Sequence, residues 1–325
     1  MQRVLFISSF RKETPMKKVR IGVSVCFFCL AMVATLVGLT GVFRKKELTS
    51  MHENFVQYKK GELDTIFIGT SHQFCSIDPT LLYEEYGISS FMMATAAQPV
   101  GLSYYAAMEA IELQEPELIV LEANYCANDV MTMADGMSHM FFDGMPNTKA
   151  KHLALQDFVE KDKWLYYYFD FFYYHNRWKE LSNQDFLSQV NDKRGGFVSE
   201  KVGYYWEIPV VDKSEKKPMP EKTKEYLDKL IALCREKEVD LVVYVAPFLG
   251  MDQNPETVEA VYEMQKVYNW LGDYLAQENV AYHNLFYELD EIGLDYTTDF
   301  YDPMHCNYLG QEKITRYMVD KGYIY

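Results

Sequence analysis

Two short polar clusters, far apart in the chain, carry the groups needed to transfer an acyl group through a serine. Residues 69–72 (GTSH) directly follow an apolar run, and residues 302–305 (DPMH) lie shortly before the C-terminus. A serine becomes a good nucleophile when a histidine takes its proton, and a carboxylate can hold that histidine in the working tautomer. The pattern predicts Ser71 as nucleophile, His305 as general base and Asp302 as the group that orients His305.

Three further side chains could belong to a site, and each also has a structural interpretation. His72 adjoins the predicted nucleophile and could line the pocket, or it could be a surface turn residue. His175 and Arg177 could bind an anionic substrate group such as a phosphate or a uronate. Their alternative role is packing or a salt bridge within the fold.

Strand and helix patterns alternate along most of the chain and predict how these residues are positioned. Apolar strand-like runs occupy residues 64–69, 88–94, 117–123, 240–246 and 280–285. Helical patterns occupy residues 78–87, 102–113, 222–238, 256–277 and 308–320. This alternation predicts an α/β fold with a parallel sheet covered on both faces. Ligands of such sheets bind at the carboxyl ends of strands, which is where Ser71 follows the first strand.

The N-terminal region has the pattern of a membrane anchor. A basic tail, residues 1–20, precedes residues 21–43, which contain no charge and are followed at once by Arg44 and two lysines. A helix of this length spans roughly 30 Å of hydrocarbon. The alternative is a cleaved signal peptide, but its apolar stretch would be shorter, about 7–15 residues. We therefore predict one transmembrane helix, with a cytoplasmic N-terminus by the positive-inside rule and an extracytoplasmic catalytic domain.

The rest of the chain divides into a polar stalk, residues 44–62, and one large domain, residues 63–325. An insertion at about residues 127–220 interrupts the strand–helix alternation. It contains residues 164–178, of which ten are aromatic. These aromatic side chains could pack on the main domain, or they could form a cap over the site and present their faces to sugar rings or an acyl chain.

Charge and motif content exclude several classes of function. The net charge is −15, and because residues 1–43 carry +5, the remainder carries −20. So acidic a domain does not bind nucleic-acid phosphates. The chain has no Walker loop, GxGxxG or HExxH motif, so we expect no nucleotide, nicotinamide, other cofactor or catalytic metal. Four cysteines outside the anchor are scattered, and we expect free, mostly buried thiols, although one or two disulfides remain open.

A Gly-x-Ser after the first strand, combined with Asp-x-x-His before a terminal helix, resembles the SGNH (GDSL-like) hydrolase superfamily. The resemblance covers roughly residues 62–126 and 222–325, and it implies a three-layer, flavodoxin-like sheet. The GTSH form, together with the anchor, looks most like the cell-envelope branch. That branch includes D-alanyl transfer proteins of the DltD kind and polysaccharide O-acetyltransferase proteins of the AlgX and AlgJ kind.

The resemblance also implies two oxyanion donors, an Asn after the third strand and a Gly after the second. Asn124 fits the first, with Asn128 as its rival. No Gly directly follows the second strand. The backbone N–H of Ala96 or Ala97, or the side-chain amide of Gln98, would have to donate instead.

The expected function is acyl-ester transfer to a cell-envelope polysaccharide or teichoic acid through an acyl-serine. The resemblance implies a multi-pass membrane acyltransferase partner that supplies the acyl group. Two alternatives stay open: a membrane-anchored carbohydrate esterase of the GDSL type, and a non-catalytic scaffold that binds polymer or partner.

Overall fold

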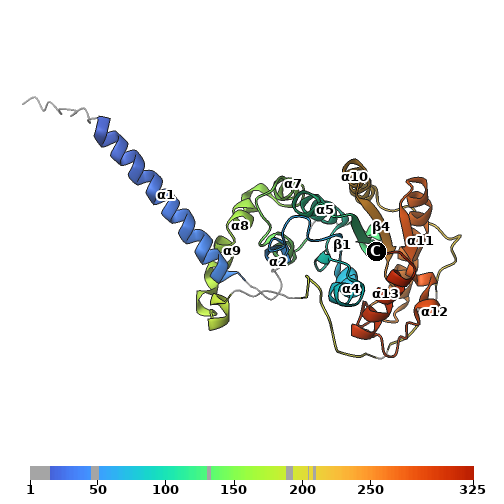
Figure 1. Ribbon diagram of the computed structural model, residues 1–325. Helices are drawn as coiled ribbons and strands as arrows, with labels where there is room; N and C mark the ends of the chain where they lie inside the picture. The colour runs from blue at the N-terminus through green and yellow to red at the C-terminus, as the bar shows by residue number, and fades with distance from the viewer. Residues whose placement is uncertain (1–14, 45–50, 130–132, 188–192, 204, 208–209) are drawn as a thin grey trace, which may run out of the picture. The chain divides into compact units, whose positions relative to one another are not determined.

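The computed structural model describes residues 15–44, 51–129, 133–187, 193–203, 205–207 and 210–325 (Figure 1). The chain forms two compact units. One unit joins the N-terminal region up to Arg44 with Phe169–Leu187, and the other holds Lys45–Tyr168 and Ser188–Tyr325. We call them the anchor unit and the α/β unit.

The α/β unit is built on a five-stranded sheet in the order β2-β1-β3-β4-β5, with every neighbouring pair parallel. The strands are β1 (Thr65–Gly69), β2 (Ser90–Ala94), β3 (Leu118–Glu122), β4 (Asp240–Val245) and β5 (Ala281–Asn284). Strands buried on both faces are apolar almost throughout, which is why their sequences are recognisable. The strand order is that of flavodoxin-like sheets, so the predicted α/β fold class is confirmed.

Helices cover both faces of this sheet. The helices after the strands are α4 (Pro79–Tyr86), α5 (Val100–Gln114), α10 (Glu221–Lys237), α11 (Pro255–Gln277) and α13 (Tyr308–Asp320). Because crossovers between parallel strands are right-handed, α5, α10 and α11 lie on one face and α4 on the other. Side chains agree: Tyr274 of α11 bonds Asp228 of α10, and Arg316 of α13 pairs with Glu85 of α4.

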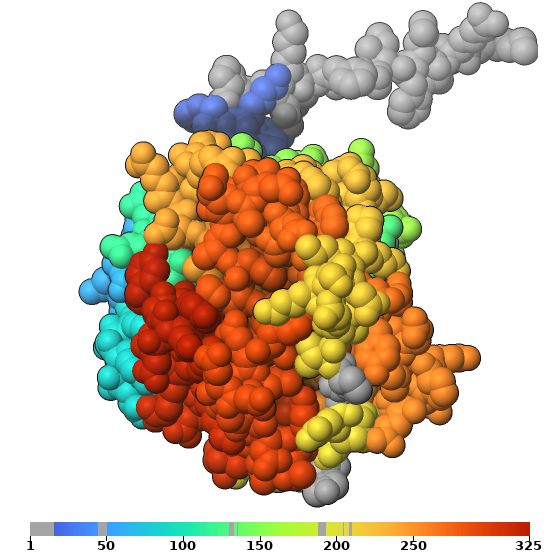
Figure 2. All heavy atoms as spheres, turned by 90° about the vertical axis from the view of Figure 1, so that its right-hand side faces the viewer, coloured from blue at the N-terminus to red at the C-terminus, as the bar shows by residue number. Residues whose placement is uncertain are grey.

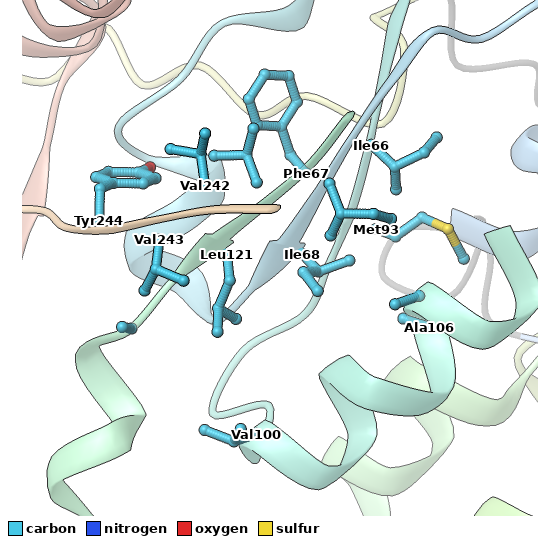
Figure 3. Close-up of a cluster of buried hydrophobic side chains, with 14 of the residues drawn as sticks. Ile66, Phe67, Ile68, Met93, Val100, Ala106, Leu121, Val242, Val243 and Tyr244 are labelled. Atoms are coloured by element: carbon cyan, nitrogen blue, oxygen red, sulfur yellow. The ribbon is translucent and has the colours of Figure 1, made fainter. Parts of the chain in front are cut away.

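The core lies between the sheet and these helices. Ile68, Leu121 and Val243 are in register on three neighbouring strands and point towards Val100 and Ala106 of α5 (Figure 3). All five side chains are buried. Burying an aliphatic side chain of Val, Leu or Ile size contributes about 1.5–3 kcal/mol, so this layer fixes the strand register on which the site depends.

The C-terminal part of the α/β unit adds short elements. These are η5 (Leu285–Tyr287), α12 (Leu289–Ile292) and an antiparallel pair, β6 (Phe300–Asp302) and β7 (His305–Cys306). The sequence patterns did not predict the strands β6 and β7. Residues 210–220 lie along α11 (Figure 2), where Val211 N–H donates to Gln265 and Lys216 pairs with Asp273.

The predicted stalk, residues 44–62, is corrected in part, while residues 45–50 lie outside the described residues. The short helix α2 (Met51–Phe55) packs into the core, and Phe55 is fully buried against Phe91. The prediction failed because this segment is mostly polar. Its two apolar residues, Met51 and Phe55, are four positions apart and lie on the same side of the helix.

The predicted insertion does not fold as one piece. Its helices α6 (Asp135–Phe142), α7 (Lys149–Phe158) and α8 (Trp164–Tyr168), with the turn η2 (Lys161–Lys163), belong to the α/β unit. There Tyr167 is buried and Trp164 packs on the core. The elements α9 (Phe171–Tyr174), η3 (His175–Lys179) and η4 (Asn183–Phe186) belong to the anchor unit. Packing on the main domain therefore describes only part of the aromatic run.

The anchor unit contains one long helix, α1 (Pro15–Phe43). Within it, Met16–Phe43 contains an 18-residue stretch with a mean hydropathy of 2.4, none of which is buried in protein. By length and composition α1 can span a membrane or act as a signal anchor. The helix begins six residues before the uncharged run at residues 21–43.

Candidate active site

Ser71 is placed by a sharp turn at the carboxyl end of β1, where it begins the short helix α3 (Ser71–Phe74). Gly69 precedes it with φ +148°, and a Cβ there would come within 3.1 Å of both the Glu122 carbonyl oxygen and Gln73 Cβ. Only glycine fits this approach without displacing the next strand. The Thr70 hydroxyl accepts a hydrogen bond from His72 N–H and holds the turn.

The structure brings the two polar clusters into one hydrogen-bonded chain. Ser71 Oγ lies 2.7 Å from His305 Nε2, and His305 Nδ1 lies 2.9 and 3.0 Å from the two Asp302 carboxylate oxygens. Asp302 ends β6 and His305 begins β7, so the tight pairing of these strands sets their spacing. The arrangement has the geometry of a serine nucleophile with its base and orienting acid.

Asp302 stays ionised in this arrangement. Burial alone would raise the pKa of its carboxyl group, but His305 and the backbone N–H groups of Met304 and His305 outweigh burial and lower it. The carboxylate can therefore stabilise the imidazolium that forms when His305 takes a proton. The side chains of His305 and Asp302 are 18% and 33% exposed, so solvent reaches this end of the chain.

His72 is not a surface turn residue, because its side chain is buried. Its ring lies 5.1 Å from the His305 ring and packs edge-on against Phe248, between centroids 5.1 Å apart. Burial, reinforced by His305, lowers the pKa of His72 to about 3, so its imidazole is neutral at ordinary pH. The Tyr301 ring stacks on the His305 ring, with centroids 5.5 Å apart. The base thus contacts two other rings.

Asn124 begins η1 (Asn124–Ala127), directly after β3. Its Nδ2 is buried and has no acceptor among the described residues. Its backbone N–H donates to Glu122 Oε1 at 3.1 Å, and its carbonyl accepts from the Tyr268 hydroxyl at 3.0 Å. The residue is fixed from both sides while its amide stays available to a ligand, which favours Asn124 over Asn128 as an oxyanion donor.

The side chain of Gln98 cannot serve as the other donor, so that prediction is corrected. Its Nε2 donates to Ser103 Oγ at 3.0 Å and to the Met93 carbonyl at 3.5 Å, and its Oε1 accepts from Thr95 N–H and Oγ. These bonds hold the loop after β2. Within that loop Ala97 has φ +53°, a left-handed conformation that glycine adopts most readily.

Glu122 is a site neighbour that the sequence did not reveal. Its Oε1 accepts the N–H groups of Asn124 and of Ala246, at 3.1 and 3.3 Å, and so links the ends of β3 and β4. Burial raises the pKa of Glu122 to about 8, against the opposing effect of these N–H groups and the Thr70 hydroxyl. The only feature of the sequence that could have indicated this role is that Glu122 is an acidic residue within an otherwise apolar strand.

His175 and Arg177 belong to the anchor unit, whereas Ser71 belongs to the α/β unit. Arg177 Nη2 bonds Asp185 at 2.9 Å and Nη1 bonds the Phe43 carbonyl, while His175 Nδ1 donates to the Phe172 carbonyl at 2.8 Å. These are the structural roles that the sequence left as the alternative. In the described part of the chain, no group of three or more His, Cys, Asp or Glu side chains is placed to hold a metal ion.

No protein-family model matches the chain, and no curated protein matches its sequence. Weak likenesses to solved structures cover most of the chain. A protein from Bacteroides fragilis described as an acylhydrolase shares 9% identity at a TM-score of 0.43, over 86% of this chain and 97% of its own. An acetylxylan esterase from Geobacillus stearothermophilus shares 11% at 0.40, over 82% and 97%. The esterase EstA from Pseudoalteromonas sp. shares 13% at 0.38, over 80% and 98%.

Proposed function

We propose that the chain is a membrane-anchored, serine-dependent acyl-ester transferase that acts on a cell-envelope polysaccharide or teichoic acid. The observation that carries this proposal is the hydrogen-bonded chain from Ser71 Oγ through His305 to Asp302. Ser71 is separated by more than 200 residues from Asp302 and His305, and the fold brings the three groups together.

In the first half-reaction, Ser71 Oγ attacks the carbonyl carbon of an acyl donor. His305 Nε2 takes the hydroxyl proton, and the carbonyl oxygen becomes an oxyanion that Asn124 Nδ2 can stabilise. Collapse of this intermediate breaks the bond to the leaving group, which receives the proton from His305. The products are acyl-Ser71 and the protonated leaving group.

In the second half-reaction, a carbohydrate hydroxyl attacks acyl-Ser71. His305 takes the proton of that hydroxyl and returns it to Ser71 Oγ as the serine ester breaks. Asp302 keeps the ring of His305 in place during both transfers. The net result moves one acyl group from donor to polymer and restores the free serine.

The anchor favours a polymer acceptor over a diffusing one. A tether gives a secreted lipase little advantage, whereas an enzyme that modifies nascent glycan or teichoic acid must stay where the polymer emerges. The proposal includes a cytoplasmic N-terminus, an extracytoplasmic catalytic domain and a location in the cell membrane. It also includes a multi-pass acyltransferase partner, because the acyl group must cross the membrane.

Hydrolysis is the second candidate, and the partial exposure of His305 and Asp302 favours it. Water that reaches this edge of the site could replace the carbohydrate hydroxyl, and the enzyme would then be a carbohydrate esterase. The chemistry at Ser71 is the same in both cases. Only the acceptor differs.

The test uses the full chain in detergent with an activated acetyl ester, with and without a polysaccharide acceptor. We expect the Ser71 ester to form, and acetylated polymer to exceed free acetate when acceptor is present. Free acetate alone would indicate the esterase. No turnover and no labelling of Ser71 by a fluorophosphonate would leave the chain as a scaffold.

A further inference from the structure

The segment Phe169–Leu187, here called the interface segment, forms one compact unit with α1 although more than a hundred residues separate them (Figure 1). Its contacts are with the last turns of the helix. Phe171 N–H donates to Thr40 Oγ at 3.3 Å, and the Phe171 ring packs edge-on against Phe43, between centroids 5.3 Å apart. The segment is therefore attached to the C-terminal end of the apolar span.

Charged side chains fix the same end. Arg44 Nε lies 2.6 Å from the Asp170 carboxylate, and both side chains are at least 90% buried. Arg177 bonds the carbonyl of Phe43, one of the carbonyls that the end of a helix leaves without an intrahelical partner. A cation at this position also suits the helix dipole. The interface segment thus caps α1 as well as packing on it.

The interface segment also exposes large apolar side chains. Trp178 is 62% exposed and Phe186 is 66% exposed. Lys179 Nζ lies 5.1 Å from the Trp178 ring centroid, which places an amphipathic ring beside an amine. Tryptophan and lysine in this combination are typical of residues at the boundary between water and hydrocarbon.

We propose that the interface segment lies in the membrane boundary at the end of α1, with Trp178 and Phe186 inserted between lipid headgroups. The occupant is lipid because the segment packs against the end of a helix whose exposed apolar surface is long enough to cross a bilayer. The segment carries a net charge of −1, so apolar insertion and not attraction to anionic lipid drives the contact. The proposal rests on α1 spanning the membrane and is independent of the chemistry at Ser71.

The experiment uses the full chain in phosphatidylcholine vesicles that contain lipids brominated either near the headgroup or near the bilayer centre. We expect headgroup-proximal bromine to quench part of the tryptophan emission. Trp178→Phe should lose most of this quenching. Trp270→Phe is the matched control, because Trp270 stacks on Tyr274 in the α/β unit, and it should keep the quenching.

Two further measurements complete the test. Quenching should be unchanged in high salt, since the segment has little net charge, and Phe186→Ser should weaken the quenching of Trp178. If Trp178 is unquenched by either lipid but shielded from acrylamide, a protein surface or a second copy covers it and the proposal is wrong. If it is unquenched and open to acrylamide, the segment stays in water, which also overturns the proposal.

Discussion

At the scale of single residues, the bond between Ser71 Oγ and His305 Nε2 makes a quantitative prediction. Ser71→Ala and His305→Ala should each remove most ester turnover, and the double variant should be little worse, because the two side chains act as one unit. Asp302→Asn should also be severely impaired, since it keeps the shape but favours the wrong tautomer of His305. Turnover by the purified full chain measures this. Additive losses would show that the residues act separately.

Asn124 and Asn128 offer a matched pair for the oxyanion donor. Asn124→Ala should raise the barrier by about 3–4 kcal/mol, the usual cost of removing one such donor. Asn128→Ala should change it little, since the Asn128 carbonyl, which the substitution keeps, is what accepts from the Thr223 hydroxyl. The ratio of kcat/KM values between variant and parent checks both. Equal losses in the two variants would remove Asn124 from the site.

Residue types and spacing predicted Ser71, His305 and Asp302, which follow a recognisable strand or precede a helix, whereas Asn124 was implied by the family resemblance. They did not predict the roles of Gln98 and Glu122. Gln98 bonds Ser103 five residues along its own loop, whereas Glu122 accepts the N–H of Ala246 at the end of another strand. No local pattern in a sequence shows whether a buried polar group faces a ligand or its own backbone.

At the scale of elements, the turn between β1 and α3 depends on Gly69. Gly69→Ala should destabilise the fold by about 1–3 kcal/mol, because the residue would be strained at positive φ and its Cβ would press on β3. Activity should fall further, since the same turn carries Ser71. Thermal unfolding and turnover measure the two effects. Gly136→Ala, in open space on α6, is the control and should be tolerated.

The strands β1 to β4 were predictable because buried parallel strands are mostly continuous apolar runs. The ends of all five predicted strands agree with the structure to within two residues. The helix α1 was predictable as well, but its association with Phe169–Leu187 was not. Aromatic side chains such as Phe171 and Tyr167 look alike in the sequence, yet one packs on α1 and the other in the α/β core. Hydrophobicity favours burial of a side chain, but it does not determine which other side chains it packs against.

At the scale of the whole molecule, His72 makes the free energy of unfolding depend on pH. Its pKa is about 3 in the folded chain and near 6.5 when unfolded, so between these values only the unfolded chain binds the proton. Stability from this residue is present above pH 6.5 and falls as pH drops, by about 1.4 kcal/mol per unit at most. Compared with His72→Phe, the parent should lose stability faster from pH 6.5 to 4 in chemical unfolding. A difference independent of pH would contradict the buried, neutral imidazole.

The orientation of the chain can be tested because its own cysteines give little background. Cys75, Cys126, Cys234 and Cys306 are buried free thiols, as predicted, and the remaining two cysteines lie in the apolar helix. A membrane-impermeant maleimide should therefore report only an introduced thiol.

In protoplasts, Gln253→Cys, on the exposed surface of the α/β unit, should be labelled at once. Ser9→Cys, in the basic tail, should be labelled only after lysis, because the six basic residues before the span favour the cytoplasmic side. The reverse labelling pattern would show the opposite membrane orientation, with Ser71 in the cytoplasm and separated from any extracytoplasmic polymer. Labelling of both in intact protoplasts would mean that α1 does not cross the membrane.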